Sequence, residues 1–389
     1  LYTKFGDIPY TTKVLSIKES MSIARTAKAT VIANVLADLD EVINGNYLPT
    51  SYDADNKGRI TRWAAMAIKA KIYLFEGNWT QVKNITSTIM TEGGFKLFGS
   101  YAGLFEIANE YNSEVILDAQ YRPTSREHQM MYVFLPPTLG GYSQLSPLQE
   151  LVDSYIMLDG KTIKETGTSF DESHPYANRD PRLKATVMYT GNSYTLADGT
   201  EVVINCEKGE GKDGYGVGSD CSATGYYIKK YWDNTYRATL YSGLNPILIR
   251  YADILLMNAE ALAELGELDK TAWDATIKPI RDRAGFTLAS ALEFPEGASK
   301  DKLIEIVRNE RRSELALEGH RHKDIIRWRI ADNVLNGWCH GLKTNDVVGT
   351  DDGYVRVENR TFNANKHYLW PIPQAERDLN GNLEQNPNW

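Results

Sequence analysis

The sequence predicts a mainly helical fold, in which hairpins of the tetratricopeptide type support an irregular, loop-rich region with a few short strands. Helix–turn–helix patterns occur near 59–90 and 248–284, each close to the roughly 34-residue length of a tetratricopeptide unit. The segment between them instead carries short β-prone runs and loops rich in Gly, Pro, Ser and Tyr. We therefore expect a single domain over 1–389, with a helical scaffold at about 15–95 and 245–330, a loop-rich insertion at about 95–245 and an irregular tail at 329–389.

Composition limits the classes of partner. The chain has 389 residues, 42% of them hydrophobic and 24% charged, which is ordinary for a globular protein. Its net charge of −8 argues against nucleic acid as a partner, because phosphate binding requires a basic surface. Tyr is abundant, with 23 residues against 10 Phe, and Tyr is favoured where a protein contacts another molecule. No apolar run reaches the roughly 18 residues that a membrane span requires.

The first part of the chain predicts helices in sequence. Residues 1–14 are expected to be extended, and apolar spacing predicts a helix over 17–44. After a polar loop, a second helix begins near Arg59 and carries apolar residues at three- and four-residue spacing. A turn at Gly77 separates it from a third helix over Trp79–Met90. This third helix is expected to be antiparallel to the second because the connection is so short.

The insertion predicts strands joined by long loops. Four short β-prone runs stand out, at Glu114–Tyr121, Ala185–Tyr189, Val202–Asn205 and Gly225–Trp232. Asp198-Gly199 is a strong hairpin turn signal between two of them. Loops as long as those between the strands are usually either functional or disordered when they occur in a compact domain.

A highly charged helix is predicted within Ile304–Trp328. Apolar residues return along it at helical spacing, so at least one of its sides is packed. Arg308 with Arg312, and Glu310 with Glu314, are like charges four residues apart, and each pair needs partners from elsewhere in the fold. We interpret these charges as structural ion pairs at the centre of the helical domain rather than as catalytic carboxylates.

The same helix also offers opposite charges at helical spacing. Glu305 with Arg308, and Arg311 with Glu314, stand three residues apart and are expected to pair along it. Gly319 is expected to stop the helix, with a second short helix following.

Seven segments in a consistent order carry a family resemblance. Together they resemble the SusD/RagB family of outer-membrane nutrient-binding proteins of the Bacteroidetes, whereas a single segment would be a weak signal. The segments are FGDIPY (5–10), GRITRWAAMAIKAKIYLFEGNW (58–79), NRDPRL (178–183), TGYYIKKY (224–231), NPILIRYADILLMNAEALAELG (245–266), NERRSELALEGHRHKDIIRW (309–328) and LWPIPQAERDLNGNLEQNPNW (369–389).

The resemblance implies a SusD-like α/α fold and a function without catalysis. Such proteins are lipoproteins on the extracellular face of the outer membrane, where they capture oligosaccharides or polysaccharides, or in some members peptides. They act with a SusC-like TonB-dependent transporter. Family members are typically longer at the front, so the lipid anchor is expected on an N-terminal part that this chain lacks. No cofactor and no metal are implied.

Under this resemblance the insertion is the expected ligand-binding region. Sugar binding requires flat aromatic rings that stack on pyranose faces and planar polar groups that bond hydroxyls. The loop after the first predicted strand supplies both, although Tyr132 and Phe134 would instead pack inward if they belonged to a strand. The candidates are Tyr121, Tyr132, Phe134 and Tyr142 as stacking platforms, Arg122 and Gln129 as hydrogen-bonding partners, and Tyr215 in a Gly-rich loop.

Other chemistry has weaker support. The chain has no GxSxG elbow and no Walker loop, and the 51–58 segment lacks the closing Glu of a calcium loop. His320 and His322 are more often helix-end residues than metal ligands. A Cys206–Cys221 disulfide is an open alternative in an oxidising compartment. A tetratricopeptide-type interaction scaffold and a helical glycoside hydrolase remain the two alternatives to a glycan-binding protein.

Overall fold

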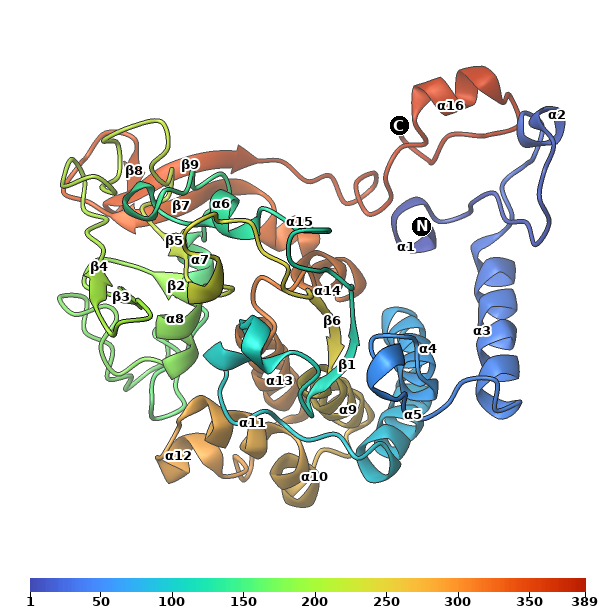
Figure 1. The fold of residues 1–389 in the computed structure, drawn as a ribbon, viewed down its shortest axis with the longest axis horizontal. Helices are drawn as coiled ribbons and strands as arrows, with labels where there is room; N and C mark the ends of the chain where they lie inside the picture. Colours follow the sequence, from blue (N-terminus) through green and yellow to red (C-terminus); the bar gives the residue numbers. More distant parts are fainter.

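The structure is a computed structural model that describes residues 1–389. Long helices form its scaffold (Figure 1). They are α3 (Lys28–Asn44), α4 (Arg62–Phe75), α5 (Trp79–Glu92), α9 (Tyr251–Leu265) and α13 (Lys300–Glu314). The predicted hairpin of α4 and α5 is confirmed. Its turn contains Gly77 at φ 70, in the left-handed region that a residue without a Cβ adopts most easily.

Helix α9 is the central element of the scaffold. It packs against α4 and α5 on one side and against α13 on the other. Its sequence is apolar around almost the whole circumference, as expected for a helix buried on all sides. Buried Asp253 is compensated by Lys71 from α4 and by Arg311 from α13, whose Nη1 lies 2.6 Å from Asp253 Oδ1. Apolar packing and buried ion pairs therefore join the same three helices.

The second predicted hairpin is present with different bounds. Its first residues form a strand, β6 (Ile247–Arg250), which leads directly into α9. The return segment is divided into α10 (Lys270–Ala275) and α11 (Ile277–Ala284), followed by the single-turn α12 (Ala289–Leu292).

The charged helix begins and ends about four residues earlier than predicted. Helix α13 ends at Glu314, and Gly319 lies in the turn before α14 (Arg321–Arg327), so Gly319 is not the residue that stops α13. The predicted pairing of Arg311 with Glu314 is also wrong, because both side chains reach partners on other elements.

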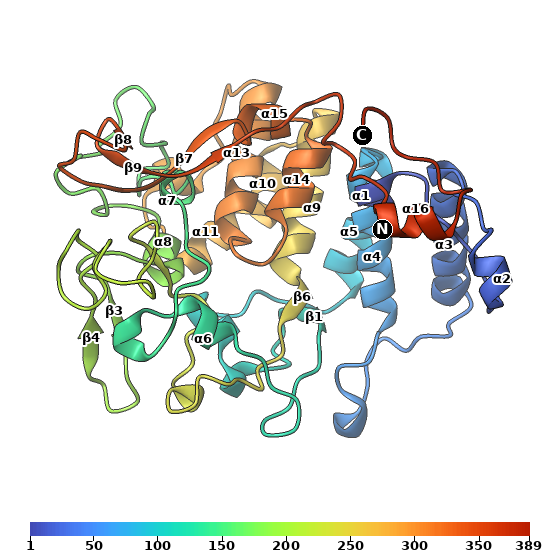
Figure 2. The ribbon, with the colours of Figure 1, turned by 90° about the horizontal axis from the view of Figure 1, so that it is seen from above.

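The two ends of the chain lie side by side at one end of the molecule (Figures 1 and 2). The predicted helix over 17–44 is interrupted, because 21–27 separate α2 (Ile17–Ser20) from α3. The expected extended entry contains a short helix, α1 (Tyr2–Phe5). The main-chain N–H of Trp370 donates to the oxygen of Lys4 (2.7 Å). The tail then ends with α16 (Gln374–Leu379).

The insertion contains short antiparallel ladders in place of one sheet. The predicted hairpin at Asp198-Gly199 is confirmed. The ladders are β1 (Val115–Asp118) with β6, β2 (Val187–Met188) with β5 (Tyr227–Ile228), and β3 (Ser193–Thr195) with β4 (Glu201–Val203). The short helices are α6 (Met130–Phe134), α7 (Gln149–Val152) and α8 (Pro181–Thr186), with 3-10 turns η1 (Ala54–Asn56), η2 (Ala102–Phe105), η3 (Ile107–Asn109), η4 (Pro137–Leu139) and η5 (Asn234–Tyr236).

The segment after α14, expected to be irregular, contains a three-stranded antiparallel sheet. After α15 (Ala331–Val334), its strands β7 (Gly337–Lys343), β8 (Thr350–Asp351) and β9 (Tyr354–Arg360) are ordered β7-β9-β8. In Figure 1 this sheet lies beside the loops of the insertion. The insertion and the tail therefore form one face together.

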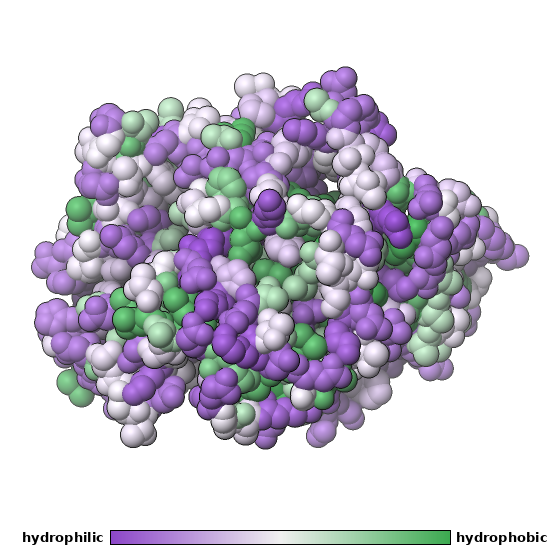
Figure 3. All heavy atoms as spheres, turned by 90° about the horizontal axis from the view of Figure 1, so that it is seen from below, coloured by the Kyte–Doolittle hydropathy of each residue, from purple (hydrophilic) through white to green (hydrophobic).

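Buried apolar residues gather in separate cores. The largest underlies the insertion, and two others lie within the helical scaffold. On the face shown in Figure 3, hydrophobic residues reach the surface in patches between hydrophilic ones, an ordinary pattern for folded proteins. None of the helices combines the length and apolar character needed to cross a bilayer.

Candidate functional site

Helix α6 anchors the Tyr-rich loop on the core of the insertion. Met131 and Leu135 are buried there, so α6 is fixed by its apolar side. The chain then turns back through η4. A Cβ at Gly141 would lie 2.1 Å from the main-chain oxygen of Leu135, so this close approach requires glycine. After the turn, the N–H of Tyr142 donates to the oxygen of Tyr132 (2.9 Å).

The turn brings two predicted site residues together. The ring centroids of Tyr132 and Tyr142 are 4.4 Å apart, at an interplanar angle of 38°. The hydrogen bond between their hydroxyls raises the pKa of Tyr132 to about 12. Tyr142 is 40% exposed, and Tyr132 is half-buried. We call these two rings, Tyr132 and Tyr142, the tyrosine platform.

Three further candidates lie before the platform in the chain. Tyr121 packs edge-on against His128, with ring centroids 4.9 Å apart, and lies under the Arg126 guanidinium. Arg122 is exposed and pairs through its main chain with Arg126. Gln129 is exposed at the start of α6, and its side chain makes no hydrogen bond within the protein. Arg122 and Gln129 are therefore free to bond a ligand.

The two remaining candidates pack into the protein. Phe134 turns away from the platform and lies against Tyr231, with centroids 6.2 Å apart, beside a small buried cluster. It lies on a helix, so the strand alternation considered for it and Tyr132 is absent. Tyr215 is half-buried against the core of the insertion.

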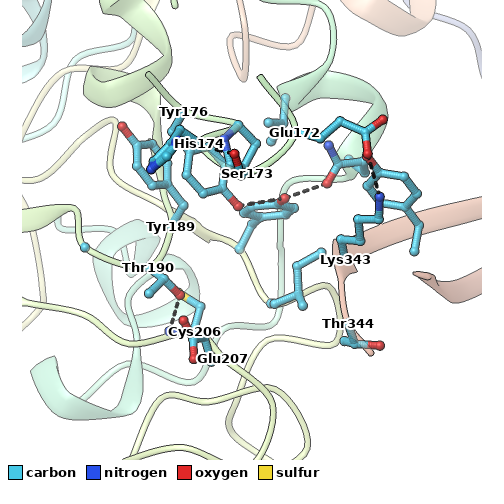
Figure 4. A pocket seen from close by; sticks show the side chains of 18 of the residues that line it. Glu172, Ser173, His174, Tyr176, Tyr189, Thr190, Cys206, Glu207, Lys343 and Thr344 are labelled. Carbon is cyan, nitrogen blue, oxygen red and sulfur yellow. Dashed lines mark hydrogen bonds and ion pairs between the residues drawn. The ribbon is translucent and has the colours of Figure 1, made fainter. Parts of the chain in front are cut away.

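A second candidate site is a pocket of about 900 Å³ between the insertion and the C-terminal sheet (Figure 4). We call it the loop pocket. Tyr176 and Tyr189 stack in it with centroids 3.9 Å apart and planes 17° from parallel. The Tyr176 hydroxyl lies 3.2 Å from that of Tyr226, which donates to Gln149 Oε1 (2.5 Å). Burial raises the pKa of Tyr176 to about 12, so this hydroxyl stays protonated.

The rim of the loop pocket is polar and internally paired. Lys343 Nζ lies 3.1 Å from Glu172 Oε2. Asp171 accepts hydrogen bonds from Ser173 and His174, which lower its pKa to about 2. The pocket escaped the sequence analysis because Tyr176 and the stacked Tyr189 are separated along the chain, and because the tail was expected to be irregular. The sequence signal nearest to this pocket is the polar run from Asp171 to His174, whose residues are exposed on its rim.

The described residues include no group of three or more His, Cys, Asp or Glu side chains arranged to hold a metal ion. Cys206 and Cys221 are free thiols, so the open alternative of a disulfide between them is not realised in this structure. The Cys206 thiol is buried, and burial raises its pKa to about 12. The chemistry that these surfaces offer is stacking and hydrogen bonding.

A helical-repeat scaffold with a loop-built, tyrosine-bearing face defines the general class of this protein. Sequence comparison defines it further: the SusD family model matches residues 104–389, and the chain belongs to that family. This confirms the resemblance seen in the sequence segments, and with it the mainly helical SusD-like fold.

Named relatives agree with this assignment. The chain is 28% identical over 355 residues to SusD-like protein P25 of Formosa agariphila, covering 85% of this chain and 61% of that protein. It is similar in structure to a SusD-like carbohydrate-binding protein from Bacteroides fragilis, with a TM-score of 0.86, 29% identity, and coverage of 98% of this chain and 76% of that one. A second SusD-like protein of that organism gives a TM-score of 0.83 at 27% identity, covering 100% and 76%.

Proposed function

We propose that this chain binds oligosaccharide or polysaccharide nutrients at the cell surface, through the tyrosine platform and without catalysis. The observation that carries the proposal is the close pair of rings formed by half-buried Tyr132 on the anchored helix α6 and exposed Tyr142 after the turn. Membership of the SusD family and the similarity to a carbohydrate-binding protein of Bacteroides fragilis support it.

The platform suits sugar rings for a physical reason. A Tyr ring presents a flat apolar face for the C–H face of a pyranose, while its hydroxyl bonds polar groups at the edge. The rings of the platform are already in place, so little rotamer freedom is lost on binding. Arg122 and Gln129 add planar donors near the same loop. The tyrosines of the loop pocket are more buried, and the hydroxyls of Tyr176 and Tyr226 are bonded to each other.

The partner and the location are part of the same proposal. The family resemblance implies a SusC-like TonB-dependent transporter and a lipid anchor on the outer face of the outer membrane. Purification of the tagged, full-length protein from detergent-solubilised outer membranes should recover such a transporter. Recovery of the protein without a transporter, from cells grown on a bound glycan, would contradict this part of the proposal.

The test of the site is affinity gel electrophoresis against a panel of polysaccharides, followed by calorimetry with the best ligand. We expect retardation without release of sugar. In the Tyr132→Ala/Tyr142→Ala variant we expect affinity to fall roughly tenfold or more, a loss of about 1.4 kcal/mol or above. Tyr47→Ala is the matched control, because Tyr47 is 66% exposed on the helical scaffold.

Any other result of this experiment would favour one of the alternative functions. Released sugar would identify a glycoside hydrolase. Binding of peptides alone would identify a peptide-binding family member, and no binding of either would favour an interaction scaffold. Unchanged glycan affinity in the double variant would move the site to the loop pocket, where His174→Ala and Lys343→Ala should then weaken binding.

A further inference from the structure

One side of helix α13 lines a pocket. Residues 301, 304, 305, 308, 309 and 312 fall on one stripe at three- and four-residue spacing, and all of them line a pocket of about 550 Å³. Arg321, Trp328 and Ile330 form the opposite wall. We call this the arginine pocket. In Figure 2, α13, α14 and α15 lie toward the top and α6 toward the bottom, so the pocket is remote from the tyrosine platform.

Two guanidinium groups in the arginine pocket lack a carboxylate partner. Arg312 donates through Nη2 to the main-chain oxygen of Glu150, whose carboxylate is 2.8 Å from His340 Nδ1. Arg321 makes no hydrogen bond or ion pair, and its guanidinium carbon lies 5.8 Å from the centre of the Trp328 ring. Both side chains are half-buried.

The acidic residues of the pocket do not neutralise these two charges. Glu264 is bound by Arg308 (2.9 Å), and Glu305 is paired with Lys302 (3.3 Å). Asp301 lies eleven residues before Arg312 on α13, about 16 Å along the helix axis. No carboxylate therefore forms an ion pair with Arg312 or Arg321, although Glu150, Asp153 and Asp324 act on them from a greater distance.

This arrangement carries an energetic cost that a ligand would remove. Burial and the charge of Arg321 together lower the pKa of Arg312 to about 10, although the charges of Glu150 and Asp153 oppose the shift. Partly buried like charges normally acquire a counter-charge, because desolvation without pairing is unfavourable. Guanidinium groups match the geometry of oxyanions, to which they donate two parallel hydrogen bonds.

We propose that the arginine pocket binds an oxyanion, the carboxylate, sulfate or phosphate group of a small ligand, through Arg312 and Arg321. The volume lies in the range of small-molecule sites and accommodates a ligand of monosaccharide size. Asn309 and the acidic residues at the other end of the pocket supply acceptors for hydroxyl groups. Ile304 and Ile330 supply apolar contact. The site is independent of the glycan-binding proposal, since it shares no residue with the platform.

Isothermal calorimetry at constant ionic strength tests this site, with sodium chloride as the reference salt. The probes are inorganic phosphate, inorganic sulfate and glucuronate, with glucose as the uncharged match for glucuronate. We expect at least one oxyanion to bind with one-to-one stoichiometry and glucose not to bind. Tighter binding of glucuronate would identify an acidic sugar, and tighter binding of phosphate or sulfate would identify an ester of that acid.

Substitutions of the two arginines test whether the oxyanion binds in the arginine pocket. Arg321→Gln should weaken binding of the oxyanion at least tenfold and should fold normally, because Arg321 has no hydrogen bond or ion pair to lose. Arg312→Gln should also weaken oxyanion binding at least tenfold. Arg321→Lys keeps the positive charge, so it should bind more tightly than Arg321→Gln. Arg59→Gln is the control, since Arg59 is exposed, forms no ion pair and does not line the arginine pocket. Absence of binding by all three oxyanions, or binding that survives both Gln substitutions, would overturn the proposal.

Discussion

The two sides of α13 differ in how far their charged side chains are paired. Glu310 and Glu314 stand four residues apart and face the protein interior, whereas Arg308 and Arg312 stand four apart on the open side. Like charges at that spacing need partners from other elements. The carboxylate row has them in full, and the arginine row has them only in part. The fully paired carboxylates form the structural centre of the fold, whereas the partly paired arginines line the proposed oxyanion site.

The paired side belongs to a balanced buried network. Glu314 accepts from Arg182 Nη1 (2.8 Å) and Arg250 Nη1 (2.6 Å), and it also contacts Arg283. No side chain in the network is more than 6% exposed. Its members are the carboxylates Glu114, Asp180, Glu310, Glu314 and Glu318 and the cations Arg182, Lys230, Arg250, Arg281 and Arg283.

The largest expected effect comes from removing the centre of this network. Glu314→Ala removes a carboxylate that three buried arginines share, and the four remaining carboxylates no longer balance the five cations. The free energy of unfolding should therefore fall by about 3–5 kcal/mol. Urea denaturation followed by circular dichroism measures the change. Glu305→Ala is the control, because Glu305 is exposed on the same helix and pairs only with Lys302, so its loss should stay below about 1 kcal/mol. Equal losses for the two variants would contradict the structural role of the network.

A smaller effect is expected from acid. Burial alone would raise the pKa of Glu318, but the charges of Arg250 and Lys230 lower it to about 2, against 4.5 for an ordinary Glu. The resulting stability is present above pH 4.5 and is lost as the pH falls toward 2, in total on the order of 3 kcal/mol.

Thermal unfolding between pH 2 and pH 7 measures this contribution. The melting temperature of the natural protein should decline mainly below pH 4.5, because protonated Glu318 no longer pairs with its cations. Glu318→Gln should be less stable at pH 7 and should show a shallower decline in acid. Parallel curves for the two proteins would show that the ionised form of Glu318 contributes nothing.

From the sequence we could predict that the charges on the buried side of α13 need partners from other elements, but not which residues those partners are. Like charges four apart on a packed helix indicated that partners come from elsewhere, and they do. The sequence does not identify the partners, because Arg182 and Arg250 come from segments far away along the chain. The predicted pairing of Arg311 with Glu314 failed for the same reason. Charged residues on the buried side of a helix pair with residues of other elements rather than with their neighbours on the same helix.

The helical hairpins were predictable because their periodicity is local, as in α4 and α5. The sheet β7-β9-β8 was missed because its polar strands carry little alternation; β9 reads YVRVENR, with one fully buried residue. At the site, loop composition indicated the segment containing Tyr132 and Tyr142. The ring pairing depends on the tight turn at Gly141, which only the three-dimensional structure shows.

The smallest expected effect sharpens the contrast between the two sides. Arg312→Leu removes a half-buried charge that has no carboxylate partner, while a leucine keeps the apolar contacts of the side-chain stem. The free energy of unfolding without ligand should therefore stay unchanged or rise by about 1 kcal/mol, because the desolvation cost disappears. Arg182→Leu is the matched substitution in the network. It should cost about 3–5 kcal/mol, since Asp180, Glu310 and Glu314 lose their shared cation. A similar loss for Arg312→Leu would place Arg312 among the structural ion pairs and remove the energetic basis of the arginine pocket.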